Sequence, residues 1–142
     1  MRWFLLISLL VLSPSSGLEG WELFHKVSFA PEYFEEADAY FEVPTFDDGL
    51  KAIVGEEVTL TGYAIPFDSD TVFILSQNPF ASCFFCGGAG PETVAEVSLK
   101  EPFKGLVIDD NVTVKGKLKL NSTDIYHLNF ILEEATYEVN EQ

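Results

Sequence analysis

The feature that most constrains the fold is a strict alternation of apolar and polar residues in the C-terminal third of the chain. Between residues 112 and 120, apolar side chains alternate with Thr113 and with the lysines at positions 115, 117 and 119. A period of two places one set of side chains on the buried face of a β-strand and the other set in water. Gly116 falls in register on the inner side. The pattern predicts a half-buried strand over residues 112–120.

Four other segments predict strands, near residues 58–67, 72–75, 93–99 and 126–132. In the first, Val58 and Leu60 share one face, Gly62 interrupts, and the apolar residues continue on the opposite parity from Tyr63. A glycine at such a switch predicts a β-bulge that lets one strand bend. In the last, alternation predicts a strand through Tyr126, Leu128, Phe130 and Leu132.

Five strands in a chain of 142 residues favour one small domain. Because the first strand is long and bent, we expect a closed or half-closed five-stranded barrel of the OB type, with the fold mainly all-β. The barrel domain is expected to span residues 56–138.

Residues 18–55 are expected to form an N-terminal arm and a short helix. The arm is rich in aromatic and acidic side chains, and Pro31 and Pro44 exclude a long helix. We expect an extended segment with a short strand near residues 27–29, whose aromatic side chains pack on the barrel; an exposed aromatic binding strip is the alternative. Either Asp47 or Asp48 can cap the short helix, and Gly55 can end it.

Residues 1–17 have the layout of a secretory signal peptide. Arg2 is followed by a short apolar run and by small residues up to Gly17, where cleavage is expected. The run is too short to span a bilayer. We therefore expect a secreted protein of the bacterial periplasm, not inserted in the membrane after cleavage, in a compartment that favours disulfides.

The chain is acidic, with 23 acidic and 8 basic side chains and a net charge of −15. This charge excludes a basic surface for nucleic acid or an anionic membrane. Pairs of adjacent carboxylates occur, among them Glu56-Glu57, Asp109-Asp110 and Glu133-Glu134. Neighbours on a strand point to opposite faces, so we expect solubilising charges rather than shared protons. Motifs for enzymatic catalysis are lacking, and no catalytic residue is assigned.

The side chains best suited to metal binding or redox chemistry lie in one C-x-x-C-G segment, which contains Cys83, Cys86 and Gly87. It resembles half of a zinc knuckle, in which the glycine allows a turn whose amides point at the sulfurs. His127, His25, Glu92 or a second copy of the chain would have to complete a zinc site. Two thiolates alone would suit monovalent copper.

Two other uses of the cysteine pair remain open. A disulfide could brace a partner-binding loop, although closing so short a loop contributes only about 2 kcal/mol. A thiol-disulfide oxidoreductase would need a lowered cysteine pKa, and the glycines that follow and the acidic surroundings do not favour one.

Three stretches resemble a family of small secreted proteins from Bacteroidetes that has no established activity. They are residues 55–66, the motif from Ser82 to Glu92, and residues 116–121. Residues 62–66 are distantly similar to a broader periplasmic family of unknown function, some members of which are encoded beside zinc-regulated ABC transporters. The resemblance implies metal handling, with a metal transporter or another exported protein as partner. The leading hypothesis is an exported, non-enzymatic binding module for zinc or copper.

Overall fold

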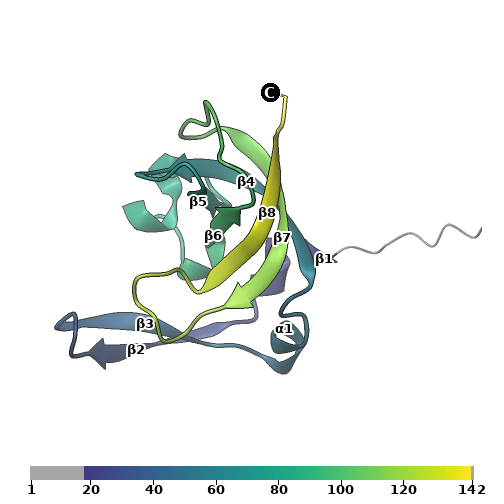
Figure 1. Ribbon diagram of the computed structural model, residues 1–142. Coiled ribbons are helices and arrows are strands. Elements are labelled where there is room, and N and C mark those ends of the chain that lie inside the picture. Colours follow the sequence, from purple (N-terminus) through teal and green to yellow (C-terminus); the bar gives the residue numbers. More distant parts are fainter. Residues whose placement is uncertain (1–17, 142) are drawn as a thin grey trace, which may run out of the picture.

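The computed structural model describes residues 18–141; the expected signal peptide, residues 1–17, lies outside the described residues. Five strands close into a barrel (Figure 1): β4 (Glu57–Pro66), β5 (Val72–Ser76), β6 (Val94–Leu99), β7 (Asn111–Leu120) and β8 (Phe130–Val139). Their order is β4-β5-β6-β8-β7, and β7 pairs back onto β4. The β6–β8 pair is parallel, whereas the other barrel pairs are antiparallel. This arrangement confirms the expected OB-like barrel.

The alternation predicted for residues 112–120 is present in β7. Val112, Val114, Gly116 and Leu118 are buried, Thr113 is half-buried, and the three lysines of the strand are exposed. Buried side chains of the other four strands fill the barrel from opposite sides, including Val58, Leu60, Phe73, Leu75, Val97, Phe130 and Leu132. The core therefore follows the period of two that the sequence carries.

The first described residues belong to this core. β1 (Leu18–Glu19) pairs in parallel with the start of β4, and the 3₁₀ turn η1 (Trp21–Phe24) follows. The Trp21 indole Nε1 donates a hydrogen bond to the Thr61 carbonyl oxygen at 2.8 Å. Phe24 is fully buried and stacks on Phe130, with ring centroids 4.0 Å apart. The predicted packing of arm aromatics on the barrel is correct for these two residues.

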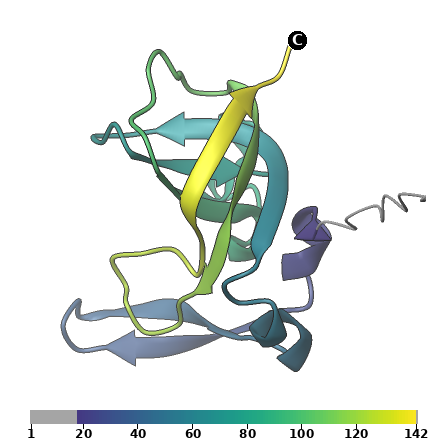
Figure 2. The same ribbon diagram turned by 45° about the vertical axis from the view of Figure 1, so that its right-hand side comes forward.

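The remainder of the arm is a β-hairpin, which differs from the expected single short strand. β2 (Ser28–Phe34) pairs with β3 (Ala39–Thr45) in a separate two-stranded sheet. At the hairpin base, Phe29 packs against the core and Pro44 is buried. At the tip, Tyr33 and Tyr40 are exposed. The hairpin extends sideways below the barrel (Figure 2), because only its base carries side chains that the barrel can bury.

The predicted short helix is present as α1 (Asp48–Ala52). Asp47 is the residue that caps it: its Oδ1 accepts a hydrogen bond from the Leu50 amide at 2.8 Å. Leu50 is buried in the core, and Gly55 beyond the helix has a φ of +86°. Within residues 18–141, no helix has the length and apolar character needed to cross a membrane.

The bulge predicted at Gly62 is wrong. The β4–β7 register runs without a shift from Glu57 to Tyr63, and Ala64 continues the buried parity of Val58 and Leu60. Gly62 is required for another reason: a Cβ at this position would overlap the Ser76 carbonyl oxygen. β4 pairs with β7 up to Tyr63 and with β5 from Tyr63 onward. β4 can pair with both neighbours because Gly62 lets the backbones of β4 and β5 come close together. No extra residue is inserted in β4.

A register shift occurs instead in β8, opposite Gly116. Lys115 pairs with Thr136 and Lys117 with Glu133, so β8 carries one extra residue here, and Glu134 has a φ of +49°. The bulge turns both Glu133 and Glu134 outward, where they form ion pairs with Lys119 and Lys117. The expectation that these adjacent carboxylates face opposite sides is wrong, because the bulge interrupts the alternation.

The last strand begins later than predicted. Residues 121–129 form a loop, and β8 starts at Phe130. Asn121 holds this loop with its side chain: Oδ1 accepts from the amides of Thr123 and Asp124, and Nδ2 donates to backbone carbonyls farther along the loop. Tyr126 is 80% exposed. These local side-chain bonds compete with strand pairing.

Candidate functional site

The cysteine segment lies between β5 and β6 and is built from three short 3₁₀ turns, η2 (Phe80–Ser82), η3 (Phe84–Cys86) and η4 (Pro91–Thr93). Cys83 is fully buried, whereas Cys86 is exposed, and both are free thiols. The Cys86 amide donates to the Cys83 carbonyl at 3.2 Å, which closes the turn. The Cys83 thiol lies close enough to the Cys86 thiol to influence its pKa. The loop therefore presents two adjacent sulfurs, one of which is open to solvent.

The glycines after Cys86 shape the turn. Gly87 has a φ of +76°, and a Cβ on Gly88 would lie 2.6 Å from the Ser82 carbonyl oxygen. Their amides donate to the carbonyl oxygens of Phe84 and Cys83 at 3.0 and 3.1 Å. In a zinc knuckle such amides point at the sulfurs. Here they bind backbone carbonyl oxygens instead, and these bonds hold the turn.

The Cys86 thiol is less acidic than a free cysteine. Partial desolvation, a hydrogen bond to Cys83 and the charge that the Cys83 thiolate would add all raise the pKa of Cys86. Redox enzymes with a C-x-x-C pair depend on the opposite shift, which provides a thiolate at neutral pH. The local electrostatics therefore disfavour catalysis by thiolate attack.

The other expected ligands lie elsewhere. His25 is exposed at the end of η1, and the Glu92 carboxylate lies against Gly90. His127 Nδ1 is 2.9 Å from Glu96 Oε1. Among residues 18–141, the structure brings together no group of three or more His, Cys, Asp or Glu side chains able to hold a metal ion.

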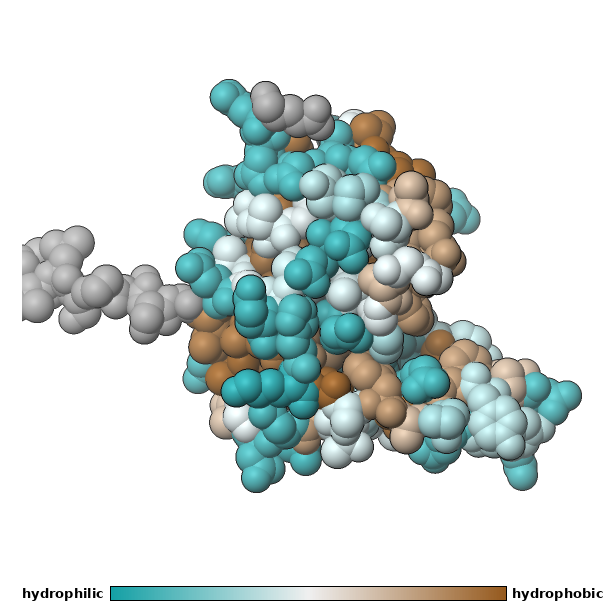
Figure 3. All heavy atoms as spheres, turned by 180° about the vertical axis from the view of Figure 1, so that it is seen from behind, coloured by the Kyte–Doolittle hydropathy of each residue, from teal (hydrophilic) through white to brown (hydrophobic). Residues whose placement is uncertain are grey.

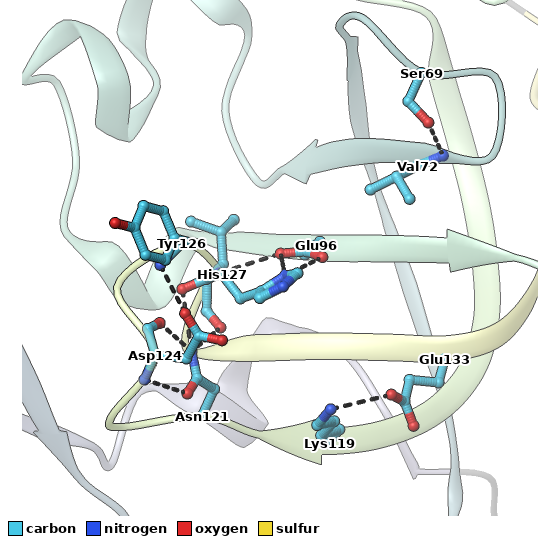
Figure 4. A network of polar contacts seen from close by, with 10 residues as sticks. Ser69, Val72, Glu96, Lys119, Asn121, Asp124, Tyr126, His127 and Glu133 are labelled. Carbon is cyan, nitrogen blue, oxygen red and sulfur yellow. Dashed lines mark hydrogen bonds and ion pairs between the residues drawn. The ribbon is translucent and has the colours of Figure 1, made fainter.

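Glu96 is a residue that the sequence analysis missed. It projects outward from β6 and binds the β7–β8 loop twice, through the His127 ring and through the Leu128 amide at 3.2 Å (Figure 4). Its side chain is only 13% exposed. The sequence did show a glutamate at an outward-facing position of the otherwise apolar segment 94–99. In the structure this glutamate anchors a loop.

A second concave site adjoins the cysteine segment. We define the hairpin cleft as the space between β3 residues 40–43, the β7–β8 loop and Phe84, and its volume is about 390 Å³. Phe34, Pro91 and Val94 complete its lining together with loop residues 122–125 and 127–129. Clefts of this size, mainly apolar with a few polar groups, are typical of ligand sites. Its aromatic wall comes from residues that the sequence analysis expected to pack on the barrel.

The fold and these two sites define a small β-barrel of the OB type that carries a hairpin arm. No protein-family model matches the chain, and no curated protein matches it. It is similar to the crystal structure of a DUF3299 family protein from Pseudomonas aeruginosa PAO1, with a TM-score of 0.52 and 16% identity over 90% of this chain and 100% of that one. At this identity the similarity shows a shared fold.

Proposed function

We propose that the protein is an exported, non-enzymatic binding module that holds a soft metal ion through Cys83 and Cys86. The observation that supports this proposal is the pair of adjacent free thiols, one buried and one exposed, on a single loop. Thiolates select soft ions such as monovalent copper and, with more ligands, zinc. The motif formed by residues 82–92 carries this site, and a metal transporter or another exported protein is the proposed partner.

The donor set favours monovalent copper over zinc. A structural zinc ion takes four ligands, and the described residues place two sulfurs together without a third group. An exposed Cys86 leaves one side of the site accessible, which suits an ion that is passed on to a partner. Zinc would require ligands from a partner protein or a second copy.

Metal binding is tested on the mature protein, purified under reducing conditions. Monovalent copper is titrated against a chromophoric chelator, with a Cys83→Ser/Cys86→Ser variant and a Ser82→Ala variant in parallel. We expect one copper per chain in the wild type and in Ser82→Ala, and none in the double cysteine variant. Equal copper in all three proteins would contradict the proposal. Zinc is titrated in the same way.

A disulfide is the competing assignment for the same pair, because the two thiols are adjacent. Intact mass of freshly exported protein under non-reducing conditions separates the two assignments. A stable mass decrease of two hydrogen atoms indicates a disulfide that braces the loop, whereas the full dithiol mass leaves both sulfurs free to bind a metal ion.

A further inference from the structure

The segments that surround the hairpin cleft carry acidic side chains and no lysine or arginine. Residues 27–50, 77–93 and 121–129 contain no lysine or arginine. Glu42 and Asp124 line the cleft itself, and further carboxylates follow along the hairpin at Glu32, Glu35, Glu36 and Asp38. Seen from behind, the arm projects from the body with hydrophilic residues at its tip (Figure 3). A ligand in this cleft would meet negative charge from the hairpin and from the β7–β8 loop.

One wall of the cleft is the free edge of β3. Within residues 18–141, β3 pairs with β2 alone, and four consecutive β3 residues line the cleft. Proline has no amide hydrogen, so inside a sheet it occupies positions whose N–H would point away from the neighbouring strand. Tyr40 and Glu42 share the parity of Pro44, and Glu42 is paired with Pro31, which also lacks an amide hydrogen. The backbone N–H and C=O groups of Tyr40 and Glu42 therefore point away from β2, toward the free edge of β3.

The remaining walls combine aromatic and aliphatic side chains with the polar β7–β8 loop, and they are partly fixed. Phe34 and Phe41 form an edge-to-face pair with ring centroids 5.6 Å apart. Glu96 and Asn121 hold the opposite loop in place through its backbone. An unpaired strand edge beside an apolar pocket is the arrangement that binds extended peptides by β-strand addition, with backbone bonds providing affinity and pockets providing specificity.

We propose that the hairpin cleft binds an extended, basic polypeptide segment, which adds to the free edge of β3 and places apolar side chains against the aromatic wall. The carboxylates select lysine or arginine in that segment, by charge complementarity and by cation–π contact with Tyr40 and Phe41. A second copy of this chain is a poor occupant, because its net charge is −15. The proposal concerns a different site from the cysteine pair and does not depend on metal binding.

Synthetic probes test the class of ligand. The main probe is a short peptide that alternates lysine with valine or phenylalanine. Three controls accompany it: the same peptide with glutamate in place of lysine, the same peptide with alternate backbone amides N-methylated, and spermidine. Binding is measured by calorimetry, and the contact surface by amide chemical shifts. We expect the lysine peptide alone to bind, with shifts at residues 40–43 and 122–129.

Two variants at one position separate charge from edge pairing. Glu42→Gln removes the carboxylate, and Glu42→Pro removes the carboxylate together with the outward N–H. We expect Glu42→Pro to bind the lysine peptide about fivefold more weakly than Glu42→Gln, which corresponds to one lost hydrogen bond. Glu138→Gln, an exposed carboxylate on β8, serves as the control and should bind like the wild type.

Four results would overturn the proposal: no binding of the lysine peptide, equal binding of the N-methylated peptide or of spermidine, equal affinity of the two Glu42 variants, or self-association of the wild type through the cleft. Amide spectra of each variant show whether the hairpin is still folded. If Glu42→Pro unfolds the hairpin, the comparison of lysine and N-methylated peptides on the wild type decides.

Discussion

Gly62 shows how one residue allows a strand to serve two neighbours. It lies where β4 leaves β7 and begins to pair with β5, directly against the Ser76 carbonyl. A methyl group at this position has no free space, and the obstacle is backbone of an adjacent strand, which cannot rotate away. The residue is therefore required by packing, and its φ lies outside the left-handed range.

We expect Gly62→Ala to lower the free energy of unfolding by about 1–3 kcal/mol, the usual cost of overpacking a rigid site. Gly49→Ala, inside α1, is the matched control. A Cβ at Gly49 would lie 3.7 Å from its nearest neighbour, Asp47 Oδ2, which is an ordinary contact distance. We expect that change to stabilise by about 0.5–1 kcal/mol through better helix propensity. Urea denaturation measures both, and a neutral Gly62→Ala would contradict the packing argument.

The charge pair beside the β8 bulge gives a pH-dependent prediction. Lys117, through a hydrogen bond and its charge, lowers the pKa of Glu134, and Glu134 in turn raises the pKa of Lys117. A carboxyl group with a lowered pKa in the folded state stabilises the fold above its unfolded pKa. That stabilisation is lost as the pH falls through the folded value.

We expect Lys117→Gln to raise the pKa of Glu134 toward its ordinary value in an NMR titration, while Lys104→Gln leaves it unchanged. Because both partners are about 58% exposed, the melting temperature at neutral pH should barely change. The pairing is refuted if the Glu134 titration is the same in wild type and Lys117→Gln.

At the level of the element, α1 depends on its cap. The helix has five residues, too few for its own hydrogen bonds to offset the cost of nucleation. The Asp47 carboxylate satisfies the Leu50 amide, and Leu50 anchors the helix in the core. Asp48 is the first helical residue, one position further along.

We expect Asp47→Ala to destabilise the protein by about 1 kcal/mol and Asp48→Ala by less, since Asp48 contributes only a favourable charge in the first turn. Chemical denaturation of the two variants compares them directly. The reverse order would assign the cap to Asp48.

At the level of the whole molecule, the barrel core extends beyond the five strands. Phe24 comes from the N-terminal segment, yet it is stacked on Phe130 of β8 and fully buried. Phe46, after the hairpin, contacts the same ring edge-on, with centroids 5.9 Å apart. Segments on both sides of the hairpin therefore fasten it to the barrel.

We expect Phe24→Ala to cost about 3–5 kcal/mol, the usual range for a phenylalanine removed from a core. Phe85→Ala, in the cysteine segment and 50% exposed, should change stability by no more than about 0.5 kcal/mol. Thermal and urea unfolding of the two variants, compared with the wild type, test this prediction. A small effect of Phe24→Ala would mean that residues 18–24 are not part of the folding unit.

Local pattern was sufficient for much of this molecule. The alternation in residues 112–120, the capped helix before Gly55 and the barrel class follow from side-chain periodicity and capping chemistry, which act over a few residues. The sequence also singled out Cys83 and Cys86, because a C-x-x-C-G spacing needs no tertiary information to be recognised. Periodicity failed at Gly62 and in β8, where the path depends on a neighbouring strand.

Which segments of the chain meet depends on the tertiary structure. The sequence marked residues 29–46 as aromatic and acidic, but whether such side chains are buried depends on the space that the barrel leaves for them. The structure buries the base of the hairpin and exposes its tip, it places His127 on Glu96 instead of beside the cysteines, and it sets the free edge of β3 against the β7–β8 loop. These contacts join residues far apart in the chain, and local propensity carries no information about such pairings.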